Sequence, residues 1–256
     1  MEIFIYTIIF IIGCFFGSFF TLAVYRIPRK EDILIKHSYC PSCNHKLGFL
    51  DLFPIFSYIF LGGKCRYCKN KIRPRYFILE VFSGLTFLLY AISLKRSVIE
   101  INIVNMFFSY IYIAILFIIA GIDKENNNIE KNVLIFGFAI EIMYIIYECI
   151  LHNIDIYRYV MYLIFIVILL LCSVIMLKKQ KKQKYLIQIL FLSLYMIFFS
   201  GSIIYALSII LTLLSIAFYK INKKEQKKLQ ISIGFFMCIS NIIIIIITNF
   251  ICNYLM

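Results

Sequence analysis

Residues 40–80 read CPSCNHKLGFLDLFPIFSYIFLGGKCRYCKNKIRPRYFILE, and this stretch decides how the rest of the chain is interpreted. It holds two Cys-x-x-Cys pairs, separated by residues 44–64. Two such pairs at this spacing are typical of a structural zinc site, in which four thiolates surround one ion and leave no open coordination position. The alternatives are disulfides or unrelated thiols. We therefore expect a structural zinc ion whose ligands are Cys40, Cys43, Cys65 and Cys68.

The composition around this stretch is that of a membrane protein. Hydrophobic residues make up 63% of the chain and charged residues only 15%, a balance that excludes an ordinary soluble domain. The net charge of +13 would suit a nucleic-acid partner if the lysines covered one folded face. Instead they occur in short clusters between apolar runs, which is the pattern of membrane topology. We expect the lipid membrane, and no nucleic acid, as a partner.

The apolar runs predict an all-α polytopic protein with about eight transmembrane helices. The first run, 3–24, has no basic leader and no cleavage signature, so we interpret it as a retained helix. Residues 25–75 form a polar domain between the first and second helices, and 76–256 form a multi-span region. The runs 185–199 and 202–219 could instead be one helix that is interrupted by the glycine between two serines at 200–202. The other seven runs are 76–93, 102–121, 133–150, 158–177, 185–199, 202–219 and 231–252.

Basic residues give this topology an orientation. If 25–75 is cytosolic, then 122–132, 178–184 and 220–230 are cytosolic as well. Those four segments contain all but three of the 26 lysine and arginine residues, the exceptions being Lys95, Arg96 and Arg158. This asymmetry follows the positive-inside rule. It also places the cysteine pairs in a reducing compartment, where zinc is favoured over disulfides.

Acidic side chains are scarce, so each is a candidate for chemistry. Asp123 directly follows the run 102–121, at the cytosolic edge of the membrane, where an ionisable group is costly unless it is solvated or paired. The plain alternative is that it only begins a hydrophilic loop. Asp51 and Glu80 flank the cysteine pairs and are weak candidates for cofactor binding. Their alternative role is structural pairing with nearby arginines such as Arg66.

These motifs resemble the type IV prepilin peptidase family, which comprises polytopic membrane enzymes of bacteria. The resemblance covers the first half of the chain and rests on motifs rather than on composition. The matching segments are Gly17-Ser18-Phe19 through Tyr25-Arg26-Ile27-Pro28, Cys40-Pro41-Ser42-Cys43, Asp51-Leu52-Phe53-Pro54-Ile55-Phe56-Ser57, Gly63-Lys64-Cys65-Arg66-Tyr67-Cys68, Arg75-Tyr76 with Glu80, and Ile122-Asp123.

The resemblance implies two activities on the leaders of type IV pilins and of related secretion or competence pseudopilins. One is cleavage of the leader by an aspartic-type endopeptidase at the cytosolic face of the plasma membrane. In that reaction Asp123 matches the first of two catalytic aspartates, which share one proton between acid and base. The other activity is methylation of the new N-terminus from S-adenosylmethionine, which the family associates with the cysteine-bearing domain, here 25–75.

The second family aspartate has no counterpart in the sequence. The family carries it in a Gly-x-Gly-Asp-x-Lys motif about sixty residues later, where this chain has Lys182 in the run KKQKKQK. Glu125, Glu130 or a partner chain would have to supply the missing carboxylate. The sequence therefore predicts a prepilin peptidase family enzyme. The alternatives are a degenerate relative that binds pilin-like helices or retains only methyl transfer, and a zinc-stabilised membrane scaffold without chemistry.

Overall fold

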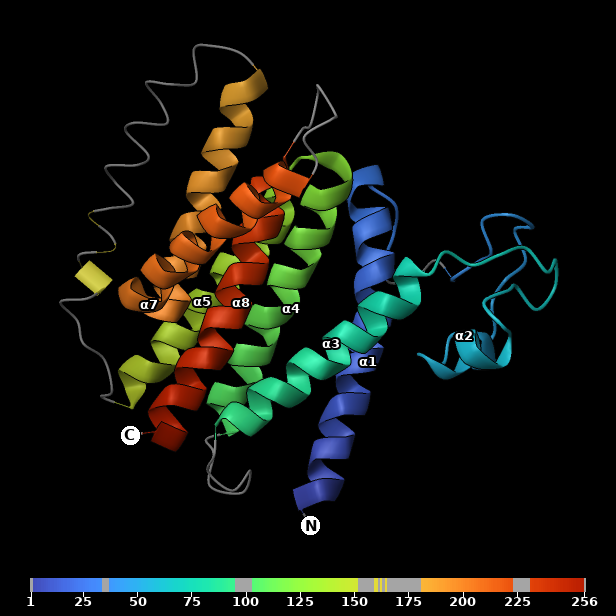
Figure 1. The fold of residues 1–256 in the computed structure, drawn as a ribbon, viewed down its shortest axis with the longest axis horizontal. Helices are drawn as coiled ribbons and strands as arrows, with labels where there is room; N and C mark the ends of the chain where they lie inside the picture. The colour runs from blue at the N-terminus through green and yellow to red at the C-terminus, as the bar shows by residue number, and fades with distance from the viewer. Residues whose placement is uncertain are drawn as a thin grey trace. The chain divides into compact units, whose positions relative to one another are not determined.

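The computed structural model describes residues 2–33, 37–94, 103–151, 159–160, 162, 164, 181–222 and 231–255, and most of these are helical (Figure 1). Six long helices are apolar enough to cross a membrane, which confirms the all-α, multi-pass fold. No strand occurs in the described ranges, where the only ladder pairs are two isolated bridges. The long helices are α1 (Glu2–Arg26), α3 (Arg75–Ser93), α4 (Ile103–Asn126), α5 (Lys131–Ile150), α7 (Lys181–Asn222) and α8 (Ile233–Phe250).

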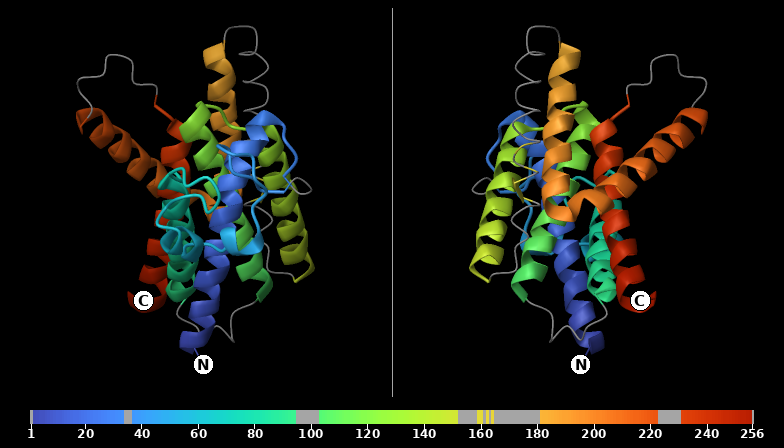
Figure 2. Two further views of the ribbon diagram at one scale, coloured as in Figure 1. Left: turned by 90° about the vertical axis from the view of Figure 1, so that its right-hand side faces the viewer. Right: turned by 90° about the vertical axis from the view of Figure 1, so that its left-hand side faces the viewer.

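The helix α7 covers two of the eight expected runs, 185–199 and 202–219. It breaks at Gly201, whose φ of 81° and ψ of 166° are open to glycine but not to other residues, and its two halves point in different directions (Figure 2). Ser200 donates a hydrogen bond to the carbonyl of Met196 at this break. The expected run 158–177 lies almost wholly outside the described residues. Of the two arrangements left open for 185–219, two separate spans or one interrupted helix, the structure shows one helix with a break at Gly201.

The chain divides into two compact units, and the first comprises residues 1–102 and 249–256. Its two long helices pack closely because glycines line their contact. A Cβ added at Gly13 would lie 2.8 Å from the Cα of Gly84, and one at Gly17 would lie 2.7 Å from the Cα of Glu80. Small residues allow two membrane helices to approach at this distance. This unit also contains the short helices η1 (Ile27–Arg29), η2 (Phe49–Asp51), α2 (Phe56–Phe60) and η3 (Ile251–Leu255).

The second unit, residues 103–248, contains α4, α5, α7 and α8. Its interior holds stacked rings, with Tyr112 lying 3.9 Å from Phe199 between ring centroids. The hydroxyl of Tyr112 donates a hydrogen bond to Asn241 Oδ1 at 2.8 Å, and the Asn241 amide reaches the hydroxyl of Ser200 at 3.4 Å. Buried polar groups inside a membrane bundle need partners of this kind, and here they join α4, α7 and α8.

Candidate functional site

The four cysteines of the motif come together in the first unit. Their Sγ atoms all lie within 4.8 Å of one another, and the Sγ atoms of Cys40 and Cys68 are 3.9 Å apart. Zinc–sulfur bonds of about 2.3 Å in a tetrahedron put sulfurs roughly 3.8 Å apart, whereas a disulfide needs about 2.05 Å. All cysteines in the described part of the chain are free thiols. The donor set and its spacing therefore fit a tetrahedral metal ion.

Each cysteine pair is folded into the same turn. The N–H of Asn44 donates to the carbonyl of Cys40, and the N–H of Lys69 donates to the carbonyl of Cys65, at 2.8 and 3.0 Å. Asn44 and Lys69 occupy equivalent places and both have positive φ values, 57° and 60°. Isolated bridges close the turns at Tyr39↔Lys46 and Lys64↔Lys71. The ring of His45 packs on Tyr67 of the other turn, 3.6 Å between centroids, which gives this histidine a structural role.

The thiol of Cys40 is prepared to ionise. Burial of Cys40 opposes its ionisation and would raise its pKa. Hydrogen bonds outweigh this effect and lower the pKa of Cys40 to about 7; they come from the backbone of Ser42 and Cys43 and from the thiols of Cys43 and Cys65. A thiolate is the form that binds a metal. Because the other thiols must also lose their protons, metal affinity at this centre should decrease as the pH falls.

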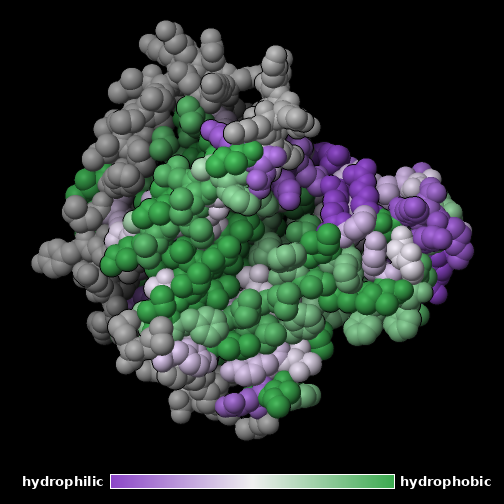
Figure 3. All heavy atoms as spheres, in the orientation of Figure 1, coloured by the Kyte–Doolittle hydropathy of each residue, from purple (hydrophilic) through white to green (hydrophobic). Residues whose placement is uncertain are grey.

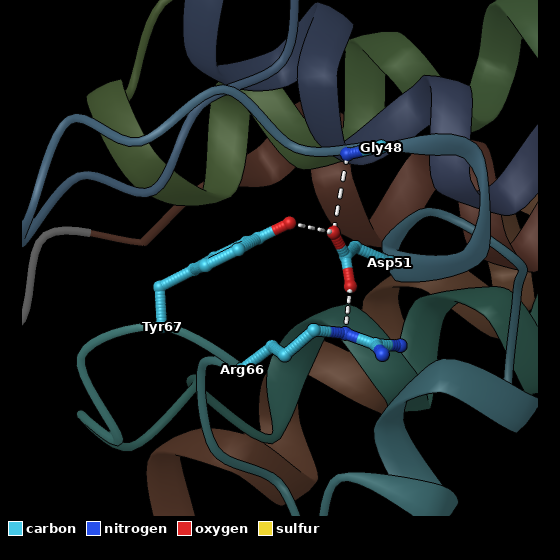
Figure 4. Close-up of polar contacts among 4 residues, drawn as sticks. All are labelled: Gly48, Asp51, Arg66 and Tyr67. Carbon is cyan, nitrogen blue, oxygen red and sulfur yellow. Dashed lines mark hydrogen bonds and ion pairs between the residues drawn. The ribbon is translucent and has the colours of Figure 1, made fainter.

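Asp51 fastens the linker between the two turns to the second turn, as Figure 4 shows. Its Oδ1 accepts a hydrogen bond from Arg66 Nε at 2.6 Å, and its Oδ2 accepts from the Tyr67 hydroxyl and the Gly48 N–H, both at 3.1 Å. Burial alone would raise the pKa of Asp51, but these hydrogen bonds and the Arg66 charge outweigh it and lower the pKa. The expected structural pairing with Arg66 is present.

This pairing predicts a pH dependence. Because the folded pKa of Asp51 lies below its unfolded value of about 3.9, its contribution to stability is present above that pH and is lost as the pH falls through the folded pKa. Asp51→Asn should cost roughly 1 kcal/mol at pH 7, since Arg66 is partly exposed. Chemical denaturation should show that the difference in unfolding free energy between the wild type and Asp51→Asn becomes smaller as the pH falls from 7 to 3. A constant difference would contradict the assignment.

Glu80 lies in the second turn of α3 and is nearly buried. Its Oε2 accepts a hydrogen bond from the N–H of Ile55 at 2.7 Å. Ile55 has φ 63° and ψ −55°, and the N–H of Phe56 bonds the carbonyl of Pro54 at 2.6 Å, so the chain makes a γ-turn here. A positive φ is strained for a β-branched residue. Glu80 therefore holds a strained turn in place.

A cavity of about 250 Å³ lies between α1, α3 and the cysteine turns. Both weak cofactor-binding candidates, Asp51 and Glu80, line it together with Arg26 and the metal-side residues Cys40 and Cys65. Four tyrosines add ring surface to its walls, namely Tyr25, Tyr39, Tyr58 and Tyr76. Arg66 lines the cavity as well, so the two acids are matched by two arginines, and the tyrosine rings are what offers a π-face to a positively charged ligand.

Asp123 lies in the second unit, near the end of α4, and is fully buried. Its Oδ2 accepts hydrogen bonds from the Tyr185 hydroxyl at 3.0 Å and from the N–H of Phe235 at 2.9 Å, whereas its Oδ1 has no partner among the described residues. Phe235 is in the first turn of α8, so the carboxylate also caps that helix. Gly234 leaves room for it, because a Cβ there would lie 3.0 Å from Oδ2.

Neither candidate for a second carboxylate reaches Asp123. Glu125 is exposed, and Glu130 accepts a hydrogen bond from Asn128 at 2.9 Å. Among the described residues, the groups bonded to Asp123 are a phenol and a backbone amide. Tyr185 occurs directly after the lysine run and carries a phenol rather than a carboxylate, so the aspartate pattern of the sequence did not point to it. Gly234, a lone glycine in an apolar run, was the signal for a close approach at this point.

Sequence reasoning also missed Glu141, in the middle of α5. It is 4% exposed, and neither of its carboxylate oxygens has a hydrogen-bond partner in the part of the chain that the structure describes. An acid inside an apolar run was a visible signal, since buried charges in membrane helices are costly. The interior around it includes Tyr195, whose ring packs against Gly137 one turn earlier on the same helix.

Known proteins match the part of the chain that carries the cysteine pairs. Residues 11–94 match the family model of the bacterial peptidase A24 N-terminal domain. The chain is 40% identical over 87 residues to the prepilin leader peptidase/N-methyltransferase of Vibrio cholerae serotype O1, which covers 30% of this chain and 34% of that protein. The enzyme of the same name in Bacillus subtilis strain 168 is 32% identical over 130 residues, covering 51% of this chain and 50% of that protein.

A third relative of that name, from Klebsiella pneumoniae, is 28% identical over 123 residues, which is 46% of this chain and 51% of the relative. The chain thus spans about a third to a half of the length of these relatives. No solved structure gives a significant match. The resemblance seen in the motifs is therefore confirmed over residues 11–94, which match the N-terminal domain of bacterial A24 peptidases and are similar to proteins named prepilin leader peptidase/N-methyltransferase.

Proposed function

We propose that this protein acts on the leaders of pilin-like precursors at the plasma membrane of a bacterium, with residues 25–75 on the cytosolic side. The observation that carries the proposal is the match of residues 11–94 to the N-terminal domain of proteins named prepilin leader peptidase/N-methyltransferase. The distribution of basic residues supports the sidedness. We further infer that Cys40, Cys43, Cys65 and Cys68 hold a structural zinc ion that orders this domain.

The name of these relatives contains two reactions, leader cleavage and N-methyl transfer. The geometry supports methyl transfer better. S-adenosylmethionine would supply a methyl group on a positively charged sulfur. The cavity beside the cysteine turns is the candidate for its site, because Glu80 and the tyrosine rings offer negative charge and π-faces to a cation. Asp51 is already held by Arg66, so Glu80 is the carboxylate better placed to accept the proton of an incoming amine. Its Oε2 would remain bonded to Ile55 meanwhile.

Leader cleavage is the second candidate, favoured by the buried and unpartnered Oδ1 of Asp123. An aspartic mechanism needs one carboxylate to activate water while another donates a proton. The neighbouring phenol of Tyr185 is a much weaker proton donor than a carboxylic acid and does not replace the second acid. The described residues place no second carboxylate beside Asp123, so cleavage by this protein requires one from elsewhere in the chain, from the precursor or from a second chain.

One experiment separates the two reactions. Purified protein in lipid nanodiscs receives radiolabelled S-adenosylmethionine with either a full precursor or a leaderless pilin peptide. We expect labelling of the leaderless peptide, lost by at least about tenfold in Glu80→Gln and retained in Asp123→Asn. Cleavage of the full precursor that disappears in Asp123→Asn would establish the second candidate instead. If neither reaction occurs in protein that retains zinc, both proposed activities are overturned.

A further inference from the structure

Residues 49–60 place an unusual number of large apolar side chains on the surface of the first unit. Phe49 is 73% exposed and Phe60 is 83% exposed. A small domain in water would bury such residues, and a contiguous exposed patch of this kind marks an interaction site. The exposed apolar side chains of this segment are Phe49, Leu50, Leu52, Phe56, Ile59 and Phe60.

The contacts of this segment place it beside the membrane-spanning part of α1. The ring of Phe53 packs edge-on against Phe15, with 5.4 Å between centroids. Phe15 lies three turns before Arg26, the basic residue that ends α1. At about 1.5 Å per residue Phe15 is roughly 16 Å from that end, close to half of the ~30 Å hydrocarbon thickness. The segment that contacts Phe15 therefore extends into the depth of the bilayer.

Two contacts with α3 agree with this depth. The ring of Tyr58 stacks on Phe77 at 5.1 Å, and the N–H of Ile55 reaches Glu80. Both partners lie beyond Arg75, where α3 begins. The chain thus runs along two membrane helices between Phe53 and Tyr58, with its apolar side chains facing outward.

The backbone of the segment is prepared for a medium without water. The N–H of Leu52 bonds the carbonyl of Phe49, and the N–H of Phe56 bonds the carbonyl of Pro54. The N–H of Ile55 lies in a strained turn and is taken up by Glu80. Non-helical backbone occurs at membrane depth only where protein groups satisfy its N–H and C=O groups. Glu80 supplies one such partner from inside α3.

The charges next to the segment complete the pattern. Figure 3 shows hydrophobic residues gathered on the lower side of the lobe formed by this domain and hydrophilic residues on its upper and outer sides. Residues 64–75 contain six basic side chains and no acidic one, which favours anionic lipid head groups. These basic residues are Lys64, Arg66, Lys69, Lys71, Arg73 and Arg75.

We propose that the apolar side chains of residues 49–60 are embedded in the membrane leaflet on the side of the cysteine domain, with Asp51 and the basic residues of 64–75 at its head groups. The segment anchors the metal domain against α1 and α3 in the plane of the bilayer. Its occupant is lipid, because the segment contacts α1 at mid-span and adjoins a basic stretch. This inference needs no substrate and does not depend on either proposed reaction.

The chain contains no tryptophan, which makes the test direct. Phe60→Trp introduces one fluorophore in the segment, and Lys46→Trp introduces one at an exposed position of the first cysteine turn. Each full-length variant is reconstituted in vesicles of phosphatidylglycerol and phosphatidylcholine brominated on its acyl chains. Zinc content measured on each sample confirms that the domain is folded. Soluble acrylamide reports the exposure of each tryptophan to water.

We expect bromine to remove most of the emission of Phe60→Trp, which should be blue-shifted and resistant to acrylamide, and to leave Lys46→Trp nearly unchanged. Equal quenching of Phe60→Trp and Lys46→Trp by acrylamide, with none by bromine, would overturn the proposal. So would a Phe60→Trp that becomes protected only after a pilin-like precursor is added, because the patch would then be a docking site for that helix. Phe56→Trp repeats the measurement at a second position of the segment.

Discussion

Cys40→Ser should remove the bound zinc and unfold residues 25–75 while leaving the membrane helices folded. A structural zinc ion contributes on the order of 10 kcal/mol of folding free energy, and a small domain of this size has few other sources of stability. Cys40 is the buried member of the first pair, so its loss also leaves three thiols around a gap. Metal analysis of purified protein should give one zinc per chain in the wild type and none in the variant.

Limited proteolysis provides the second readout, since an unfolded domain is cut between residues 30 and 70 and a folded one resists. The matched control is Cys252→Ser, which changes an exposed cysteine remote from the cluster in sequence. It should keep both zinc and resistance. A Cys40→Ser protein that retains one zinc would contradict the four-thiolate centre, as would a wild type that contains none. Removal of zinc by a chelator should reproduce the effect of the variant.

Gly17→Leu should separate α1 from α3 and disturb the cavity beside the cysteine turns. A Cβ at Gly17 would lie 2.7 Å from the Cα of Glu80 and 3.0 Å from the carbonyl oxygen of Leu79, so the backbone of α3 has to move. Overpacking costs about 1–3 kcal/mol where side chains can adjust, and we expect the upper end or more against a backbone. The shift also displaces Glu80 from Ile55.

Thermal unfolding in nanodiscs, followed by tyrosine exposure, measures this effect. Phe19→Leu is the matched control, because Phe19 lies on the same helix, is exposed and faces no glycine contact. The control should leave the melting temperature within about a degree of the wild type, since surface substitutions rarely exceed 0.5 kcal/mol. Equal melting temperatures for Gly17→Leu and Phe19→Leu would show that the close helix contact is not needed.

Much of the fold was readable from the sequence because a membrane imposes simple rules. Apolar runs of sufficient length become helices, and α1, α3, α4, α5 and α8 cover expected runs. The interruption at Gly201 was readable for a local reason, since only glycine adopts its backbone angles easily. The cysteine cluster was readable because two Cys-x-x-Cys turns commonly place their four thiolates around one tetrahedral ion.

The environments of the acids were decided by tertiary structure alone. Asp51 and Glu80 were candidates for cofactor binding, and both line the cavity. Asp51 also bonds Gly48 and Arg66, and Glu80 also bonds the N–H of Ile55. The sequence cannot predict such partners, because they lie on segments far along the chain. Asp123 was placed correctly at the end of a span, but its contacts with Tyr185 and the start of α8 depend on how three helices pack.

The sequence by itself determined the class of protein, a multi-pass helical membrane protein with a four-cysteine centre, and its resemblance to the prepilin peptidases. These follow from composition and from local spacing, which act within one segment at a time. Tertiary structure decided which carboxylates are free to react and where the apolar segment 49–60 lies. A buried hydrogen bond or a ring contact at Phe15 exists only once distant segments are brought together, and no local pattern records it.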